Sequence, residues 1–268
     1  MDDIDSPNSL RNDQIAAFRE RGFIKLEGVL PVEVLDRFGP EFSRIVHERN
    51  TQTLPMEERS TRQQAFIQVI NLWKESEEAK RFVFGKRLAR IAAELMGTRG
   101  VRLYHDQALF KEAGGGFTPW HADQYYWPFA TDRCCTVWIP LQDTLAEMGP
   151  IAFSEGSHWV TEGRDLNISD ESEVRIEDVL RSAGKTTIEQ TFSRGDVSFH
   201  YGWTFHRAAG NRTERDREAM TMIYMDVDMR MKEEDNPHQQ AAIWCPGVKV
   251  GEIIDTPVTP VIYEAVGR

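Results

Sequence analysis

Residues 101–123 have the sequence VRLYHDQALFKEAGGGFTPWHAD. The first part, Val101 to Lys111, is a short run rich in apolar residues and is followed by turn-forming residues, which is typical of a buried β-strand. The stretch Ala113 to Gly116 ends that strand with a flexible loop. A histidine and a carboxylate, His121 and Asp123, follow closely. The region therefore predicts a β-rich core with chemically active side chains beside it.

The rest of the second half of the chain continues this pattern of short strands and turns. After Gly97, short apolar or alternating runs predominate, and turn signals separate them. The further strands that we expect are Thr136 to Gln142, Ile151 to Ser154, Thr186 to Phe192, Val197 to Tyr201 and Ala219 to Val227. Residues 162–184 are highly charged and weakly periodic, which indicates a surface insertion with one short helix near Ile176 to Ser182.

The first 97 residues are patterned mainly as helices. A strand is expected at Phe23 to Leu26, and a helix that opens at Pro31 should break or kink at Gly39-Pro40. Ser76 to Met96 has a helical period, which Gly85 divides into two helices.

Helices first and many strands afterwards favour a mainly β (α+β) fold, an antiparallel β-barrel or jelly roll buttressed by N-terminal helices. We expect one domain over residues 1–268, in which 1–97 form the helical buttress and 98–268 the jelly-roll core. The length alone is compatible with one large domain or two small ones. One barrel is favoured because candidate ligands spread from His121 to His206 have to converge on a single site.

The composition excludes several classes of protein. Lys and Arg total 32 against 43 Asp and Glu, a formal net charge of −11, which argues against bulk binding to nucleic acid. No run of about eighteen apolar residues occurs, so we expect no membrane span. Three cysteines cannot form a fully paired disulfide framework, and the acidic first residues resemble neither a secretory signal nor a transit peptide. We therefore expect a cytoplasmic protein that acts on a small molecule.

One constellation of residues indicates metal chemistry. His121 and Asp123 are two residues apart, and residues at that spacing share one face of a strand. With His206 they would complete two histidines and one carboxylate, the ligand set of non-haem Fe(II) sites that keep positions open for substrate and oxygen. Arg217 follows eleven residues after His206, and its planar guanidinium suits a carboxylate.

Each of these features is common by itself. A lone His-x-Asp is more often a surface turn or an ion pair, a lone histidine after a strand is more often structural, and Arg217 lies in a charged turn. The order and spacing on a β-rich sequence carry the prediction.

Four segments of this sequence resemble the phytanoyl-CoA dioxygenase family of Fe(II)- and 2-oxoglutarate-dependent oxygenases, and the resemblance covers nearly the whole chain. They are DQIAAFRERGFIKLEGVLPVEVL (13–35), HDQALFKEAGGGFTPWHADQYYWPF (105–129), WIPLQDTLAEMGPIAFSEGSHW (138–159) and GWTFHRAAGNRTERDREAMTMIYM (202–225). The resemblance implies a double-stranded β-helix, a jelly-roll barrel with N-terminal helices. It also implies that His121, Asp123 and His206 bind iron and that Arg217 binds the distal carboxylate of 2-oxoglutarate.

The same resemblance suggests further residues of the co-substrate site. Thr136 and Trp138 follow the His-x-Asp block where relatives place a second co-substrate contact, and Gln107 matches a position that often lines that site. Ordinary barrel core is the alternative for all three. A substrate wall, with aromatic core packing as its alternative, is expected from Tyr125, Tyr126 and Trp203.

The remaining histidines are predicted to have other roles. His105 and His200 lie in apolar strands, where hydrogen bonding in the core is expected, and His158 belongs to a turn. His47 and His238 are expected to be exposed.

The resemblance implies hydroxylation of an aliphatic C–H bond of a small metabolite or natural-product intermediate, with O2 consumed, succinate and CO2 released, and ascorbate as a reductant. A carboxylate at Asp123 favours such an outcome over halogenation, because related halogenases have a small residue there. The alternatives are a metal-dependent isomerase or hydrolase of cupin type and a catalytically silent binding protein. Arg217 argues against the first, and the intact set of four residues argues against the second. The sequence selects no substrate, no oligomeric state and no lid function for residues 162–184.

Overall fold

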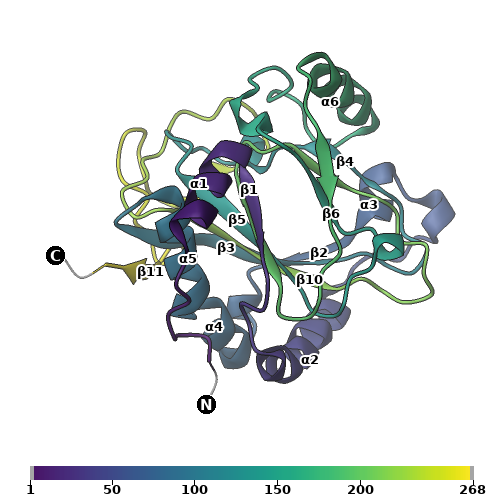
Figure 1. Ribbon diagram of the computed structural model, residues 1–268, viewed down its shortest axis with the longest axis horizontal. Coiled ribbons are helices and arrows are strands. Elements are labelled where there is room, and N and C mark those ends of the chain that lie inside the picture. Colours follow the sequence, from purple (N-terminus) through teal and green to yellow (C-terminus); the bar gives the residue numbers. More distant parts are fainter. Residues whose placement is uncertain (1–2, 266–268) are drawn as a thin grey trace.

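The structure, a computed structural model, describes residues 3–265, whose strands form two antiparallel sheets (Figure 1). The larger sheet has the strand order β1-β8-β5-β10-β3-β11, and β2 also pairs with β3; the smaller sheet has the order β4-β9-β6-β7. The strands are β1 (Phe23–Leu26), β2 (Ile67–Ile70), β3 (Gly100–Phe110), β4 (Thr118–His121), β5 (Cys134–Pro140), β6 (Ile151–Ser154), β7 (Thr187–Glu189), β8 (Val197–Tyr201), β9 (His206–Ala208), β10 (Ala219–Asp226) and β11 (Val261–Glu264).

The two sheets pack against each other through buried apolar side chains. Phe23 and Trp138 of the larger sheet share one cluster with Ile151 and Phe153 of the smaller sheet. The rings of Phe23 and Phe153 are stacked at 4.6 Å between centroids. This arrangement is a jelly roll of the double-stranded β-helix type, and the predicted fold, mainly β with helices, is confirmed.

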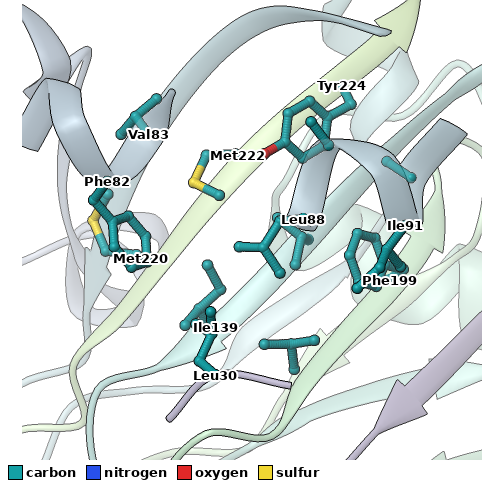
Figure 2. Close-up of a cluster of buried hydrophobic side chains, with 14 of the residues drawn as sticks. Leu30, Phe82, Val83, Leu88, Ile91, Ile139, Phe199, Met220, Met222 and Tyr224 are labelled. Carbon is teal, nitrogen blue, oxygen red and sulfur yellow. The ribbon is translucent and has the colours of Figure 1, made fainter. Parts of the chain in front are cut away.

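Helices cover the outer face of the larger sheet, where α2, α4 and α5 lie together in Figure 1. The helices are α1 (Asn12–Arg21), α2 (Val32–Arg49), α3 (Thr61–Ala65), α4 (Glu77–Val83), α5 (Lys86–Met96), α6 (Asp170–Ser182) and α7 (Ala241–Trp244). Figure 2 shows Met220 and Met222 of β10 directed toward the helices that carry Phe82 and Leu88. Each such buried side chain stabilises the packing by about 1.5–3 kcal/mol.

The second helix was expected to break or kink at Gly39-Pro40, and the structure contradicts the break. Helix α2 runs without a break through Gly39 and Pro40. One face of it stays buried on both sides of the proline, with Phe38 before it and Phe42 after it. Burial of that face offsets the backbone hydrogen bond that Pro40 cannot donate. The predicted division at Gly85 is confirmed, because this glycine separates α4 from α5.

The first 97 residues are more than a helical buttress. Strand β1 pairs with β8 at one edge of the larger sheet, and β2 pairs with the second half of β3, from Gln107 to Phe110. Strands β2, β4, β9 and β11 were not among the predicted strands. They are three or four residues long, which is too short for a clear alternation of apolar and polar residues.

The insertion at residues 162–184 packs onto the smaller sheet beside β4. Its helix α6 starts at Asp170, earlier than predicted, and contributes Ile176 and Leu180 to a cluster with Trp120 and Phe205. None of the described helices has the length and apolar character that a bilayer crossing requires.

The C-terminal part of the chain builds a second apolar cluster against β3. Met229, Cys245 and Ile254 pack there with Tyr104 and Phe129. This packing holds α7 next to the interior of the barrel.

Candidate metal centre and cofactor pocket

The two candidate histidine ligands face each other across the smaller sheet. His121 ends β4, His206 begins β9, and the two are direct partners in the register of these antiparallel strands. Side chains that are opposite in such a pair lie on the same face of the sheet. The two imidazole rings are accordingly 4.1 Å apart between centroids.

Asp123 joins the two histidines although it lies just outside the strand. β4 ends at His121, and Asp123 begins a 3₁₀ turn over Asp123–Tyr126. Ala122 keeps an extended backbone, with φ −124° and ψ 131°. The alternation of an extended chain therefore still places Asp123 on the side of His121, as the spacing predicted.

The three side chains converge on one point. Asp123 Oδ1 lies 3.7 Å from His121 Nε2 and 3.6 Å from His206 Nε2. One ligand atom from each of the three residues lies within 4.8 Å of the others. One cation can therefore contact all three after small side-chain adjustments, leaving positions open toward the cavity.

Hydrogen bonds orient both imidazoles for metal binding. His121 Nδ1 donates to the Pro119 carbonyl at 2.8 Å, and His206 Nδ1 donates to the Thr204 carbonyl at 3.0 Å. A carbonyl partner fixes the proton on Nδ1, so the lone pair of Nε2 is free for a metal. The residues present therefore fit a metal such as Fe(II).

The protonation states also suit a metal ligand set. Burial, together with the neighbouring His206, lowers the pKa of His121 to about 3, and burial lowers the pKa of His206 to about 4. Both imidazoles are thus neutral at pH 7. Burial alone would raise the pKa of Asp123, but His206 and the hydrogen bond from His200 hold that pKa below its usual value. The carboxylate is therefore ionised.

The second carboxylate oxygen of Asp123 is held by two neighbours on the larger sheet. Thr136 Oγ1 donates to Asp123 Oδ2 at 2.7 Å, and His200 Nε2 donates to the same oxygen at 3.1 Å. Thr136 and His200 are direct partners in the β5–β8 pair. Together they leave Oδ1 as the oxygen that faces the two ligand histidines.

Arg217 is a buried cation without a carboxylate partner among residues 3–265. It is 3 % exposed, and Nη1 donates to the Leu109 carbonyl at 3.2 Å while Nε has no partner. Its guanidinium lies 5.5 Å from the centre of the Trp138 ring. Burial lowers the pKa of Arg217 to about 10, so it remains charged at neutral pH. A ligand that brings a carboxylate would satisfy this group.

The candidate ligands and Arg217 line one cavity of about 280 Å³. Gln107, Thr136 and Trp138 line it too. Gln107 Oε1 accepts a hydrogen bond from Gln68 Nε2 at 2.6 Å, which fixes its amide. The three residues suggested for the co-substrate site thus all face the cavity, although Thr136 directs its hydroxyl to Asp123.

Three aromatic residues were expected to form a substrate wall. Among residues 3–265, the cavity lining includes one of them. Tyr126 lines it, and its hydroxyl accepts from the Ile168 N–H at 2.9 Å. Tyr125 does not, because a 3₁₀ turn rotates successive side chains by about 120° and sends this ring elsewhere. Trp203 packs under the guanidinium of Arg164 at 4.6 Å, on the turn that joins β8 to β9. The structure therefore places Tyr126 on the cavity lining and Tyr125 and Trp203 away from it.

Several lining residues were missed by reasoning from the sequence. His105 and His200 are buried and His238 is exposed, as expected, and all three also line the cavity. Strand alternation offered a signal for His200, because Val197 and Phe199 face the apolar core and Ser198 and His200 face the other way. Only tertiary structure brings in His238, Gln240 and Trp244 of the C-terminal segment.

The insertion contributes to the site by direct contacts. Ile168 lines the cavity. Glu173 of α6 accepts from the Trp120 N–H at 2.8 Å and forms an ion pair with Arg207 at 2.7 Å. Residues 162–184 therefore support β4 and one wall of the cavity.

Comparison with known proteins gives one family match and several structures of similar fold. The family model for phytanoyl-CoA dioxygenase (PhyH) matches residues 18–219. The structure is similar to the non-heme alpha ketoglutarate dependent carbocyclase SnoK from nogalamycin biosynthesis (TM-score 0.79, 22 % identity, 96 % of this chain and 100 % of that chain). It is also similar to the epimerase SnoN in complex with Fe3+, alpha ketoglutarate and nogalamycin RO (0.76, 22 %, 94 % and 98 %).

A further similar structure is EctD from S. alaskensis with 2-oxoglutarate and 5-hydroxyectoine (TM-score 0.66, 20 % identity, 83 % of this chain and 78 % of that chain). At these identities the structural likeness concerns the fold. No curated protein sequence matches this chain. The family match ends at residue 219, before the C-terminal segment that lines the cavity.

Proposed function

This chain belongs to the phytanoyl-CoA dioxygenase family, and we propose that it is an Fe(II)- and 2-oxoglutarate-dependent oxygenase acting on a small molecule. One observation carries the proposal. The cluster of His121, Asp123 and His206 shares a single cavity with Arg217, a buried arginine that has no carboxylate partner among the described residues.

The chain's residues have distinct tasks in this function. His121, Asp123 and His206 would hold the iron, which supplies the oxidising chemistry together with 2-oxoglutarate and O2 when they are bound. Carbonyl partners fix both imidazoles, and Thr136 and His200 fix the carboxylate. These contacts give the ligands their orientation before a metal arrives.

Arg217 would anchor the distal carboxylate of 2-oxoglutarate. Its unpartnered Nε and its position above the Trp138 ring leave the guanidinium open to a planar, doubly hydrogen-bonded contact. The buried surroundings exclude water and strengthen that contact. A metal-dependent isomerase or hydrolase would give no reason for such an arginine.

Hydroxylation of an aliphatic C–H bond, with release of succinate and CO2, is the reaction that we propose. A carboxylate ligand at Asp123 occupies the place that halogenation would need for a halide. The solved carbocyclase and epimerase have similar folds, so ring closure and epimerisation are the competing outcomes. Product mass distinguishes them, because hydroxylation adds one oxygen atom and epimerisation leaves the mass unchanged.

The test is succinate formation by purified protein supplied with Fe(II), ascorbate, 2-oxoglutarate and O2. We expect slow succinate release without substrate and a loss of at least about 100-fold in Asp123→Ala and Arg217→Ala. Arg212→Ala is the matched control, because Arg212 is exposed and has no side-chain partner among residues 3–265. Equal succinate formation by all four proteins would overturn the proposed function.

A further inference from the structure

A positively charged side chain, that of Arg62, lies at the exposed mouth of the cavity. Arg62, on the short helix α3, lines the cavity together with His121 and Tyr126. Its positive charge is close enough to act on both of these side chains. The described part of the chain offers Arg62 no ion pair and no hydrogen bond.

Two acidic side chains of α6, on the side of Thr61, are already engaged. Asp170 accepts a hydrogen bond from Thr61, the residue before Arg62, at 2.7 Å. Glu173 is held by Arg207 and by the Trp120 N–H. A free arginine at the mouth is notable in a chain whose net charge is −11.

The charges of the proposed site do not neutralise Arg62. Fe(II) and Arg217 contribute three positive charges, and Asp123 with the 2-oxoglutarate dianion contributes three negative charges. The loaded centre is therefore neutral, which leaves the charge of Arg62 without compensation. A substrate with an anionic group at the mouth would complete the balance.

Two aromatic rings, tilted by 37° to each other, line another part of the cavity. The ring of His105 lies 5.0 Å from that of Trp244, and both line the cavity. Burial lowers the pKa of His105 to about 4, so this imidazole is neutral, and its Nδ1 has no partner. Aromatic side chains of this kind can pack against a planar ring.

The C-terminal segment that carries Trp244 is fixed in place. Asn236 and Gln239 donate to the Tyr125 carbonyl at 3.0 and 3.3 Å. Gln240 lines the cavity and has a left-handed backbone, with φ 47°. A non-glycine residue in that conformation is strained, and such strain clusters at ligand sites.

We propose that the substrate of this site is an anionic ring compound, whose carboxylate or phosphate pairs with Arg62 and whose planar ring lies along Trp244 and His105. This inference rests on the proposed function, since it concerns the substrate of the same cavity. Arg62 is a binding residue that selects substrates by charge, and Trp244 selects them by shape.

The test is anaerobic titration calorimetry on protein loaded with Fe(II) and saturated with 2-oxoglutarate, so that Arg217 is occupied. The probes are 2-naphthoate, 2-naphthyl phosphate and the uncharged 2-naphthamide. We expect wild type to bind one of the two anions about tenfold more tightly than the amide, with the preference falling as salt rises. The anion that binds more tightly identifies the group that the substrate carries.

Arg62→Gln should remove the preference for the anion, whereas the control Arg212→Gln should keep it. Arg62 is exposed, so this variant should fold normally. Trp244→Phe should weaken anion and amide alike and leave their ratio unchanged. The proposal is overturned if wild type binds neither anion, binds anion and amide equally, or keeps its preference in Arg62→Gln.

Failure of the proposed function gives a different result. If 2-oxoglutarate itself does not bind, the same probes are titrated into metal-free Arg217→Met protein. A preference that depends on Arg62 in that background would preserve the anion site and reject only the oxygenase assignment.

Discussion

Arg217→Met should have opposite effects on the stability of the empty protein and on its response to 2-oxoglutarate. A pKa lowered from 12.5 to about 10 by burial corresponds to about 3 kcal/mol against the charged side chain in the fold. Methionine removes that cost. It also removes one hydrogen bond to the Leu109 carbonyl, worth about 1 kcal/mol, and the contact with the Trp138 ring, worth about 1 kcal/mol. We expect the empty variant to be more stable than wild type by about 1 kcal/mol.

The ligand response should be lost in the same variant. Two charge-assisted hydrogen bonds to a carboxylate are together worth about 3–5 kcal/mol, which is at least about 100-fold in affinity. At a concentration of 100 times its Kd, 2-oxoglutarate should stabilise metal-loaded wild type by about 2.7 kcal/mol. For a chain of this size that is a rise in Tm of about 5–10 °C.

Thermal unfolding with Mn(II) in place of Fe(II), with and without 2-oxoglutarate, measures both effects. Arg217→Met should unfold about 2–4 °C above wild type when empty and should gain less than about 1 °C from the ligand. Arg212→Met should behave as wild type in both conditions. The reasoning is refuted if Arg217→Met loses more than about 3 kcal/mol of stability when empty and still responds to 2-oxoglutarate as wild type does. Arg217 would then be a structural residue.

Two further predictions concern groups around the site. Thr136→Val removes the hydrogen bond to Asp123 Oδ2 and should weaken metal binding by about 10–100-fold, measured by calorimetric competition with a chelator. Thr136→Ser keeps the hydroxyl and should bind the metal as wild type does. Equal metal affinities in all three proteins would contradict the role given to this hydroxyl. Burial and the nearby Arg217 lower the pKa of Lys111 to about 6, so between about pH 6 and 10.5 the unfolded chain binds a proton that the folded chain does not. The difference in unfolding free energy between wild type and Lys111→Met, measured by urea denaturation, should therefore shift in favour of wild type by about 2 kcal/mol from pH 7 to 8.5. If this difference does not change with pH, Lys111 stays charged in the fold.

Reasoning from the sequence located the barrel and the metal ligands because both have local signatures. β6 and β8 were predicted residue for residue, since apolar runs bounded by turns define them. His121 and Asp123 were predicted to share a face from their spacing alone. Their partner His206 lies in a three-residue strand, and only its distance along the chain from the other two, together with the family resemblance, singled it out.

Other parts of the site depend on contacts between distant segments. His200 holds Asp123 because the β5–β8 register places it beside Thr136, which no local pattern reveals. His238 and Trp244 reach the cavity because the C-terminal segment packs against β3 in the second apolar cluster. Tyr125 does not line the cavity because a 3₁₀ turn, with a period near three, follows β4 where alternation was assumed.

The most direct test of the central claim is an anaerobic titration of the purified protein, first with Fe(II) and then with 2-oxoglutarate, followed by visible absorption. The account predicts one Fe(II) per chain and a charge-transfer band that 2-oxoglutarate produces only when the iron is bound. Asp123→Ala should lose the iron, and Arg217→Met should need at least about 100-fold more 2-oxoglutarate to produce the band. Wild-type protein that binds no Fe(II), or that binds it and produces no band with 2-oxoglutarate, would contradict the account.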